Sequence, residues 1–196
     1  MLSIKKYAAI DIGSNAVRLL ISNIIEQKGK PVLFKKNSLV RVPIRLGSDV
    51  FITHKISKEN TQRIIDTMLA FKLLMKSHKV VKYKACATSA MRESTNGKKV
   101  VDLVLKNSGI SIDIIGGEEE AAIIAATDLN SFIDPSKTYL YVDVGGGSTE
   151  FTVIHEGQSV ASKSFKIGTV RLLNDMFSKE AWLELDEETM TALWIA

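Results

Sequence analysis

The sequence predicts an α/β fold with a mixed sheet, in which three antiparallel N-terminal strands are flanked by helices. Apolar segments at 7–12, 16–24 and 32–42 are joined by short turns, as in antiparallel strands. Residues 59–79 place apolar side chains at helical spacing behind Ser57, a residue type that caps helix N-termini. A strand that ends in aspartate and continues into a glycine turn also occurs twice. This recurrence predicts two related half-folds, each of which offers one turn to a shared cleft.

Composition and charge narrow the functional class. Hydrophobic residues make up 45% and charged residues 24% of the 196 positions, which is ordinary for a soluble globular protein. The net charge of +4 suits an anionic ligand, whereas no basic stripe with interleaved aromatic residues indicates a nucleic-acid polymer as partner. No apolar run reaches about 18 residues, so no membrane span is expected. The single Cys86 fits a reducing compartment, and we expect a cytoplasmic protein.

The second glycine turn, within 139–151, is the most informative stretch of the chain. Its first strand is β-branched and aromatic, carries one charge at Asp143 and is expected to be buried. The glycines at 145–147 permit close approach of the backbone to a ligand, and N–H groups in such a turn form a concave anion site. Ser148 adds a hydroxyl donor, and Glu150 opens the next strand. Two carboxylates beside an anion-binding turn imply a hard cation such as Mg²⁺; the alternative is a tight hairpin whose acids face water.

The first turn follows the opening strand, where Asp11 precedes Gly13, Ser14 and Asn15. Asp143 lies 132 residues after Asp11, a distance too long for a solenoid repeat. The spacing therefore favours two half-folds that share one cleft.

Between the two turns the sequence predicts further helices and strands. Residues 43–53 are expected to be irregular, and 83–87 to form a short buried strand. The segment 88–97 is predicted to be a loop at the carboxyl end of that strand, where open α/β sheets bind ligands. Arg92 in this loop has a planar fork that matches phosphate oxygens, although a solvated loop residue is the simpler alternative.

A helix at 98–108 and a strand at 110–115 lead to a further helix, which begins at Gly116 and is expected to run to about Asn130. Three successive glutamates, 118–120, lie in its first turn, where acids complement the helix dipole. Glu120 is the one expected to face the cleft, with the other two in solvent.

The chain is divided into a first domain at 1–126 and a second domain at 127–196. The second domain begins like the first and then provides only helical material after residue 175, with one amphipathic helix at 186–196. Further strands and crossover helices are missing, so the second domain is expected to be incomplete. Its bare edge and face are expected to take cover from another copy, which predicts a homodimer; the alternative is that the second half lacks a stable cleft. The strands of this domain are expected at 139–144, 151–155 and 160–165.

Together these residues resemble the exopolyphosphatase and guanosine pentaphosphate phosphohydrolase (Ppx/GppA) family of the actin-like, sugar-kinase and Hsp70-type ATPase superfamily. One glycine motif alone would be weak support, but five segments occur in the family's order and cover most of the chain. The resemblance implies an actin-like ATPase (ribonuclease H-like) fold with an incomplete second domain. The matching segments are 10–19, 87–92 with 96–97, 115–121, 142–150 and 164–172.

The resemblance also implies an activity and its residues. The family hydrolyses terminal phosphoanhydride bonds of inorganic polyphosphate, or the 5′ phosphate of pppGpp, with Mg²⁺. By this resemblance Glu120 is the catalytic base, while Asp143 and Glu150 are catalytic residues that position metal and water. The implied phosphate-binding residues are Asp11, Ser14, Asn15, Arg92, Gly145, Gly146, Gly147 and Ser148.

Two other functions stay open at this stage. A kinase or ATPase of the same superfamily would need an adenosine pocket from a late glycine motif, and none follows Gly168. A non-catalytic polyphosphate- or nucleotide-binding module would bind without turnover. Polyphosphate and pppGpp remain alternative substrates, and the oligomeric state and the activity of an incomplete chain also remain open.

Overall fold

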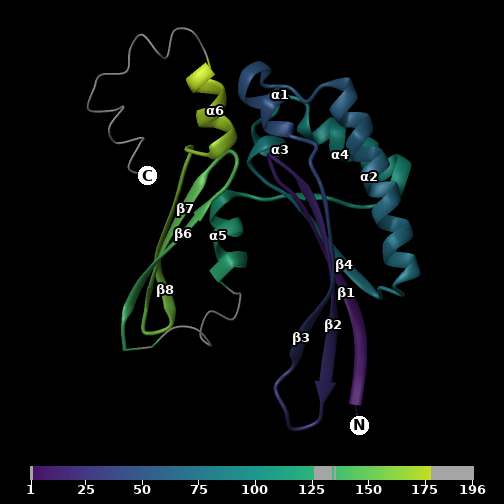
Figure 1. Ribbon diagram of the computed structural model, residues 1–196, viewed down its shortest axis with the longest axis vertical. Helices are drawn as coiled ribbons and strands as arrows, with labels where there is room; N and C mark the ends of the chain where they lie inside the picture. Colours follow the sequence, from purple (N-terminus) through teal and green to yellow (C-terminus); the bar gives the residue numbers. More distant parts are fainter. Residues whose placement is uncertain (1, 126–133, 135, 178–196) are drawn as a thin grey trace.

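The computed structural model describes residues 2–125, 134 and 136–177, which form two units, each built on its own sheet (Figure 1). The strands are β1 (Leu2–Ile12), β2 (Val17–Gln27), β3 (Leu33–Val42), β4 (Lys82–Ala87), β5 (Asp113–Ile114), β6 (Thr138–Val144), β7 (Thr149–His155) and β8 (Gln158–Phe165). The helices are α1 (Leu46–Thr53), α2 (Lys58–Ser77), α3 (Ser89–Glu93), α4 (Gly97–Ser108), α5 (Gly117–Ala125) and α6 (Thr169–Phe177).

The first unit confirms the predicted α/β class with a mixed sheet. Its strands have the order β3-β2-β1-β4-β5, and β1 pairs antiparallel with β2 but parallel with β4. The three antiparallel N-terminal strands are therefore confirmed. The long helix α2 begins as predicted after Ser57, whose hydroxyl accepts a hydrogen bond from the Asn60 N–H at 3.1 Å.

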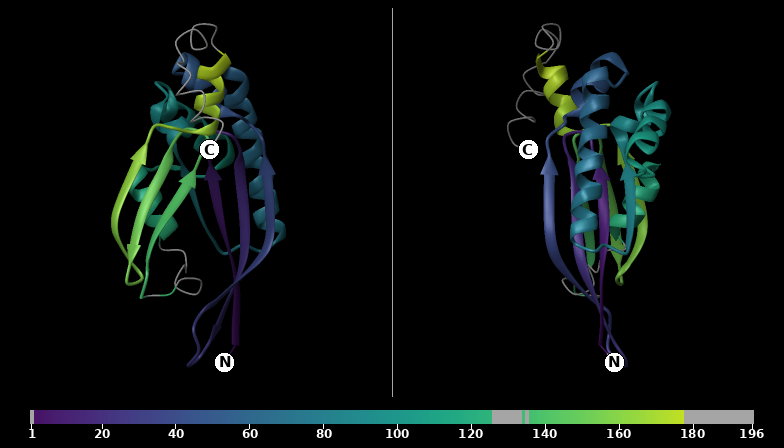
Figure 2. Two further views of the ribbon diagram at one scale, coloured as in Figure 1. Left: turned by 60° about the vertical axis from the view of Figure 1, so that its left-hand side comes forward. Right: turned by 90° about the vertical axis from the view of Figure 1, so that its right-hand side faces the viewer.

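One face of the five-stranded sheet is buried beneath α2 and α4 (Figure 2). Successive strand residues point to opposite faces, and in β1 the side chains of Ala8, Ile10 and Ile12 are buried while Ala9 is exposed. Because the even positions of β1 belong to the core, the odd position Asp11 projects from the opposite face. The sheet thus directs Asp11 toward the second unit.

Three predictions for the first unit are wrong. The segment 43–53, expected to be irregular, contains the helix α1, and the segment 88–97, expected to be a loop, contains the short helix α3. Both helices are too short to show a clear apolar period in the sequence. The strand expected at 110–115 pairs only at Asp113 and Ile114. The isoleucines around it are buried in the core but do not pair as a strand. Their apolar side chains therefore indicated burial and not strand formation.

The second unit repeats the first three strands. Strands β6, β7 and β8 are joined in order as antiparallel neighbours, which confirms the strands predicted there. Helix α5 packs against β7 and β8 on one face. The expectation that 139–144 is a buried strand is wrong, because Leu140, Val142 and Val144 are exposed on the other face. In the described part of the chain, that other face of the sheet is open.

Several predictions lie outside the described residues. These are the extension of the α5 helix to Asn130, most of the domain boundary at 126–137, and the helix at 186–196. Within the described residues, no helix is long and apolar enough to cross a membrane.

Candidate functional site

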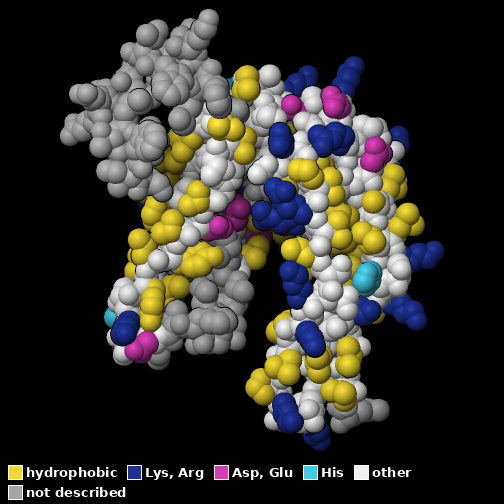
Figure 3. Space-filling view, in the orientation of Figure 1, with side chains coloured by type: hydrophobic (Ala, Val, Ile, Leu, Met, Phe, Trp, Pro, Cys, Tyr) yellow, Lys and Arg dark blue, Asp and Glu magenta, His cyan; other side chains and the backbone are white. Residues whose placement is uncertain are grey.

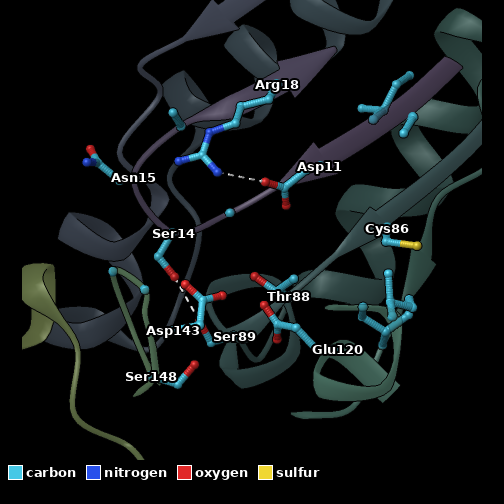
Figure 4. Close-up of a pocket in the computed structure, with 18 of the residues that line it drawn as sticks. Asp11, Ser14, Asn15, Arg18, Cys86, Thr88, Ser89, Glu120, Asp143 and Ser148 are labelled. Carbon is cyan, nitrogen blue, oxygen red and sulfur yellow. Dashed lines mark hydrogen bonds and ion pairs between the residues drawn. The ribbon is translucent and has the colours of Figure 1, made fainter. Parts of the chain in front are cut away.

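A cleft of about 680 Å³ lies where the two units meet. It is lined by residues of both glycine turns, of β1, β2 and β4, and of α5 (Figure 4). The space-filling view shows the hollow between the two units, with acidic and basic side chains gathered beside it (Figure 3). Six predicted site residues other than glycine belong to this lining, and they are Asp11, Ser14, Asn15, Glu120, Asp143 and Ser148.

The first turn joins β1 to β2. Its hairpin pairs Asp11 with Arg18 in register, and their side chains form an ion pair at 3.2 Å. The Gly13 N–H donates to the Ala16 carbonyl at 3.1 Å and closes the turn. From the start of α1, the Arg45 and Gly47 N–H groups donate to the carbonyls of Asn15 and Ser14 at 2.9 and 2.8 Å. The start of the short helix α1 therefore supports the first turn through these two hydrogen bonds.

The second turn, between β6 and β7, has the same construction. Asp143 pairs in register with Glu150, and the Gly145 N–H donates to the Ser148 carbonyl at 2.8 Å. The N–H groups of Thr169 and Val170 at the start of α6 donate to the carbonyls of Gly145 and Gly146 at 3.0 and 2.9 Å. Helix α6 thus supports the second turn as α1 supports the first.

This support orients the peptide groups of both turns. In a trans peptide the carbonyl and the next N–H point in opposite directions, and the described residues contain no cis peptide. Since the turn carbonyls point toward α1 and α6, the N–H groups of Asn15 and of Gly146 and Gly147 point away from those helices. Backbone N–H groups of this kind suit an anion such as phosphate.

Glu120 lies in the first turn of α5, and its side chain is 19% exposed. Its Oε2 atom is 3.8 Å from Arg92 Nη1, within ion-pair range, yet it is buried and has no hydrogen-bond partner. Burial, and then the nearby Glu150 carboxylate, raises the pKa of Glu120 to about 7. A carboxyl group with this pKa changes its protonation state at neutral pH, as a general base requires.

Asp143 and Glu150 face each other across the second hairpin. Glu150 is buried and accepts a hydrogen bond from the Ser164 hydroxyl at 2.8 Å. Burial, and then the charge of Glu150, raises the pKa of Asp143 above its ordinary value. Asp11 also has a raised pKa, because burial outweighs the opposing effect of Arg18. Negative charge is therefore concentrated around the second turn.

Three predicted residues lie beside the cleft rather than along its lining. Arg92 donates from Nη1 to the Ile115 carbonyl at 2.7 Å, so its guanidinium is held at the base of α5. Glu150 is covered by its own sheet and α5. At Gly147, an added Cβ would lie 2.5 Å from Phe51 and from the Ser89 hydroxyl, so this glycine packs against the first unit.

The Ser14 hydroxyl is also engaged within the protein. It lies 2.9 Å from the Ser89 hydroxyl in a buried contact, which links the first turn to α3. Ser148, Gly145 and Gly146 belong to the cleft lining. In the close-up, Asp143 and Glu120 lie on either side of Ser89, while Asn15 lies apart from them (Figure 4).

Several site residues escaped the sequence analysis. Arg18, Lys84 and Cys86 line the cleft, and so does Glu119, which was expected to face solvent. Arg171 contacts both the second turn and α3, through Gly147 and Glu93. Arg18 had a recognisable pattern, since it follows Asp11 by seven residues as Glu150 follows Asp143. The contact between Arg171 and Glu93 spans 78 residues and has no local pattern.

Comparison with known proteins gives a consistent result. The sequence pattern that defines the Ppx/GppA phosphatase family matches residues 22–193. A bifunctional 3-dehydroquinate synthase/phosphatase of Fusobacterium nucleatum is 33% identical over 186 residues, which cover 92% of this chain and 28% of that protein. Exopolyphosphatase 2 of Mycobacterium tuberculosis is 30% identical over 176 residues, covering 87% of this chain and 54% of the relative.

A third relative has a different named substrate. The guanosine-5′-triphosphate,3′-diphosphate pyrophosphatase of Vibrio vulnificus is 30% identical over 175 residues, covering 87% of this chain and 33% of that protein. Among solved structures, the Ppx/GppA family member of Aquifex aeolicus superposes with a TM-score of 0.74 at 28% identity. The match covers 90% of this chain and 56% of that one. The chain therefore spans about half or less of the length of these relatives.

Proposed function

The chain belongs to the Ppx/GppA phosphatase family and has its actin-like ATPase fold, and from that premise we propose that it hydrolyses terminal phosphoanhydride bonds. The proposed substrates are inorganic polyphosphate or pppGpp, and the proposed nucleophile is water. The observation that carries the proposal is the position of Glu120. This half-buried carboxylate has a pKa of about 7 and lines a cleft between two turns suited to phosphate.

In this proposal Glu120 is the general base. Glu120 belongs to the cleft lining, where its carboxylate is proposed to accept a proton from water. The proton moves from water to Glu120 as the water oxygen attacks the terminal phosphorus, and the shortened phosphate chain leaves. Because only the ionised carboxylate accepts the proton, phosphate release is expected to rise with pH through about 7.

We assign phosphate binding to the two turns and their neighbours. The backbone N–H groups of Asn15, Gly146 and Gly147 point away from their supporting helices, and the Ser148 hydroxyl lies in the same lining. Arg92 adds a positive charge beside Glu120. The full proposed set is Asp11, Ser14, Asn15, Arg92, Gly145, Gly146, Gly147 and Ser148.

Mg²⁺ is the proposed cofactor, with Asp143 and Glu150 as its protein ligands. Hard carboxylate oxygens suit Mg²⁺, which commonly takes one or two carboxylates and completes its shell with water and substrate phosphates. The described residues contain no group of three or more acidic, His or Cys side chains placed to hold a metal. The raised pKa of Asp143 also fits, because a cation would relieve its repulsion from Glu150. When bound, Mg²⁺ would neutralise charge that develops on the phosphate oxygens.

The proposal extends to domains, location and assembly. We propose a first domain at 1–126 and a second at 127–196, and a cytoplasmic location, which the single Cys86 supports. A homodimer is supported by the open apolar face of the second sheet, where Phe151, Val153 and Phe165 line a groove. Light scattering across a range of protein concentrations is expected to give twice the monomer mass, and a monomer at all concentrations would contradict the dimer.

The test of the activity compares two glutamates in one helical turn. Phosphate release from polyphosphate and from pppGpp, measured side by side with Mg²⁺, is expected to fall about 10²- to 10⁴-fold in Glu120→Gln. Glu118→Gln is the matched control, because Glu118 is exposed and lies outside the cleft lining, and it is expected to keep full activity. Unchanged release in Glu120→Gln would remove Glu120 from the mechanism. Tight binding of both substrates without turnover at any Mg²⁺ concentration would indicate a binding module instead.

A further inference from the structure

Arg171 joins the two units at the second glycine turn. It lies in the first turn of α6, and its Nε donates to the Gly147 carbonyl at 3.1 Å. Its Nη2 donates to both carboxylate oxygens of Glu93, at 3.0 and 2.8 Å. The guanidinium carbon also lies 4.1 Å from the centre of the Phe51 ring. Three separate contacts therefore fix one side chain, and they come from α1, α3 and the turn itself.

The ion pair of Arg171 is largely buried and is not a surface ion pair. The side chains of Arg171 and Glu93 are only 20% and 22% exposed. A planar guanidinium can satisfy a carboxylate and a carbonyl together, whereas a lysine ammonium has no such fork. The Phe51 ring also fills the space beside Gly147, since a Cβ there would lie 2.5 Å from it. The Gly147 peptide is thus contacted by both Phe51 and Arg171.

Helix α3 connects this contact to the catalytic base. Glu93, which binds Arg171, directly follows Arg92, whose guanidinium lies 3.8 Å from Glu120 Oε2. In the described residues, adjacent positions of α3 thus form the two ion pairs that reach α5 and α6. A shift of α3 relative to the second turn would move Arg92, which lies beside Glu120, away from its place relative to that turn.

We infer that Arg171 is a positioning residue, which fixes the second glycine turn relative to Arg92 and Glu120. Its catalytic consequence rests on the proposed function. Arg171 does not line the cleft, so it acts through Gly147 and Glu93. A misplacement of about 1 Å at a reacting centre can lower a rate about 100-fold, so a residue of this kind has a large effect without touching substrate.

The first test measures hydrogen exchange of backbone amides in Arg171→Lys. The N–H groups of Thr169 and Val170 bond to the second turn and are expected to exchange at least about tenfold faster in this variant. The N–H groups of Arg45 and Gly47, which make the equivalent bonds to the first turn, are the internal control and are expected to stay unchanged. Unchanged exchange at both turns, or an equal increase at both, would overturn the inference.

A charge swap separates positioning from ion pairing. The double variant Glu93→Arg with Arg171→Glu restores opposite charges but has no donor for the Gly147 carbonyl. We expect its exchange at Thr169 and Val170 to remain fast. Restoration of slow exchange by the swap would show that the ion pair alone suffices, and the role of the Gly147 contact would be lost. Lys5→Gln breaks an exposed ion pair elsewhere and serves as control.

The catalytic test uses the intact chain with polyphosphate and Mg²⁺. Arg171→Lys is expected to lower kcat about 10- to 100-fold while KM changes less than about threefold, because the lost contact acts on geometry. Lys5→Gln is expected to leave both constants unchanged. If the unaltered chain releases no phosphate, the proposed function fails while the exchange experiment still decides the role of Arg171. If the chain is active and Arg171→Lys keeps its kcat, the positioning role is wrong.

Discussion

In the first turn Asp11 faces Arg18 across the hairpin, and in the second Asp143 faces Glu150. The backbones of the two turns are built alike, since each closes on one N–H to carbonyl bond and is held by the start of a short helix. Only the second turn pairs like charges, which destabilises a hairpin. Both turns therefore have N–H groups that suit phosphate, and only the second adds a pair of carboxylates, which suits a cation that offsets the phosphate charge.

The difference in charge between the two turns also affects the pKa of Glu120. Glu150 is the second largest cause, after burial, of the raised pKa of Glu120, and it acts in the same way on Asp143. Arg18 acts in the opposite direction and lowers the pKa of Asp11. Substitutions that remove a difference between the two turns therefore test this comparison.

The largest effect is expected for Glu150→Gln, which removes the like charge of the second turn. Phosphate release is expected to fall about 100-fold, because Mg²⁺ loses a proposed ligand. Stability at pH 8 is expected to rise by an amount on the order of 1 kcal/mol. Asp143 and Glu120 have raised folded-state pKa values, so their destabilising ionisation appears as pH rises through those values and is absent at pH 3.

Urea unfolding at pH 8 and pH 3 measures this difference. The control is Glu156→Gln, which removes an exposed carboxylate from the β7–β8 turn of the same sheet. An equal stability change at the two pH values in Glu150→Gln would contradict the repulsion argument.

A smaller effect is expected when Gly147 takes the residue of the first turn. In Gly147→Asn the new side chain meets Phe51 and the Ser89 hydroxyl at 2.5 Å, and such overpacking costs about 1–3 kcal/mol. The reciprocal Asn15→Gly adds no atoms and is expected to cost less than about 1 kcal/mol. Thermal unfolding of both variants provides the measurement. Equal losses would show that the two turns are packed alike.

The smallest effect is expected for Arg18→Gln. The Asp11–Arg18 pair is 46% and 53% exposed at its side chains, so its loss is expected to cost no more than about 0.5 kcal/mol at pH 7. The difference is expected to vanish near pH 2, where Asp11 is protonated with or without Arg18. Chemical unfolding at both pH values tests this, and a loss near 2 kcal/mol at pH 7 would mean that the pair supports the first turn's structure.

Much of the construction of the two turns could be predicted from the sequence. The aspartate and glycines of each turn are local patterns, and so are the strands that lead into them, because period-two alternation and glycine turns need only neighbouring residues. The role of Glu120 as the base follows from the resemblance to the family, whereas its place in the first turn of a helix alone fits an acid that complements the helix dipole. The structure adds that its neighbour Glu119 reaches the same lining.

The features that the sequence did not predict depend on contacts between distant segments of the chain. The helices α1 and α3 were missed because each is short, yet α1 holds the first turn and α3 carries Arg92 and Glu93. The exposure of Val142 and Val144 depends on which face α5 covers, and β-branched composition does not contain that information. The contact between Arg171 and Glu93 arises only when the two units come together.

Burial and the Glu150 carboxylate of the second turn raise the pKa of Glu120 to about 7, the value on which its proposed role as a base depends. The most direct measurement is a ¹³C NMR titration of the Glu120 carboxyl in the metal-free chain, assigned by comparison with Glu120→Gln. A midpoint near pH 7 is expected, and it is expected to move to lower pH in Glu150→Gln. A midpoint at 4.5, the ordinary value for glutamate, that does not change in Glu150→Gln would contradict this expectation.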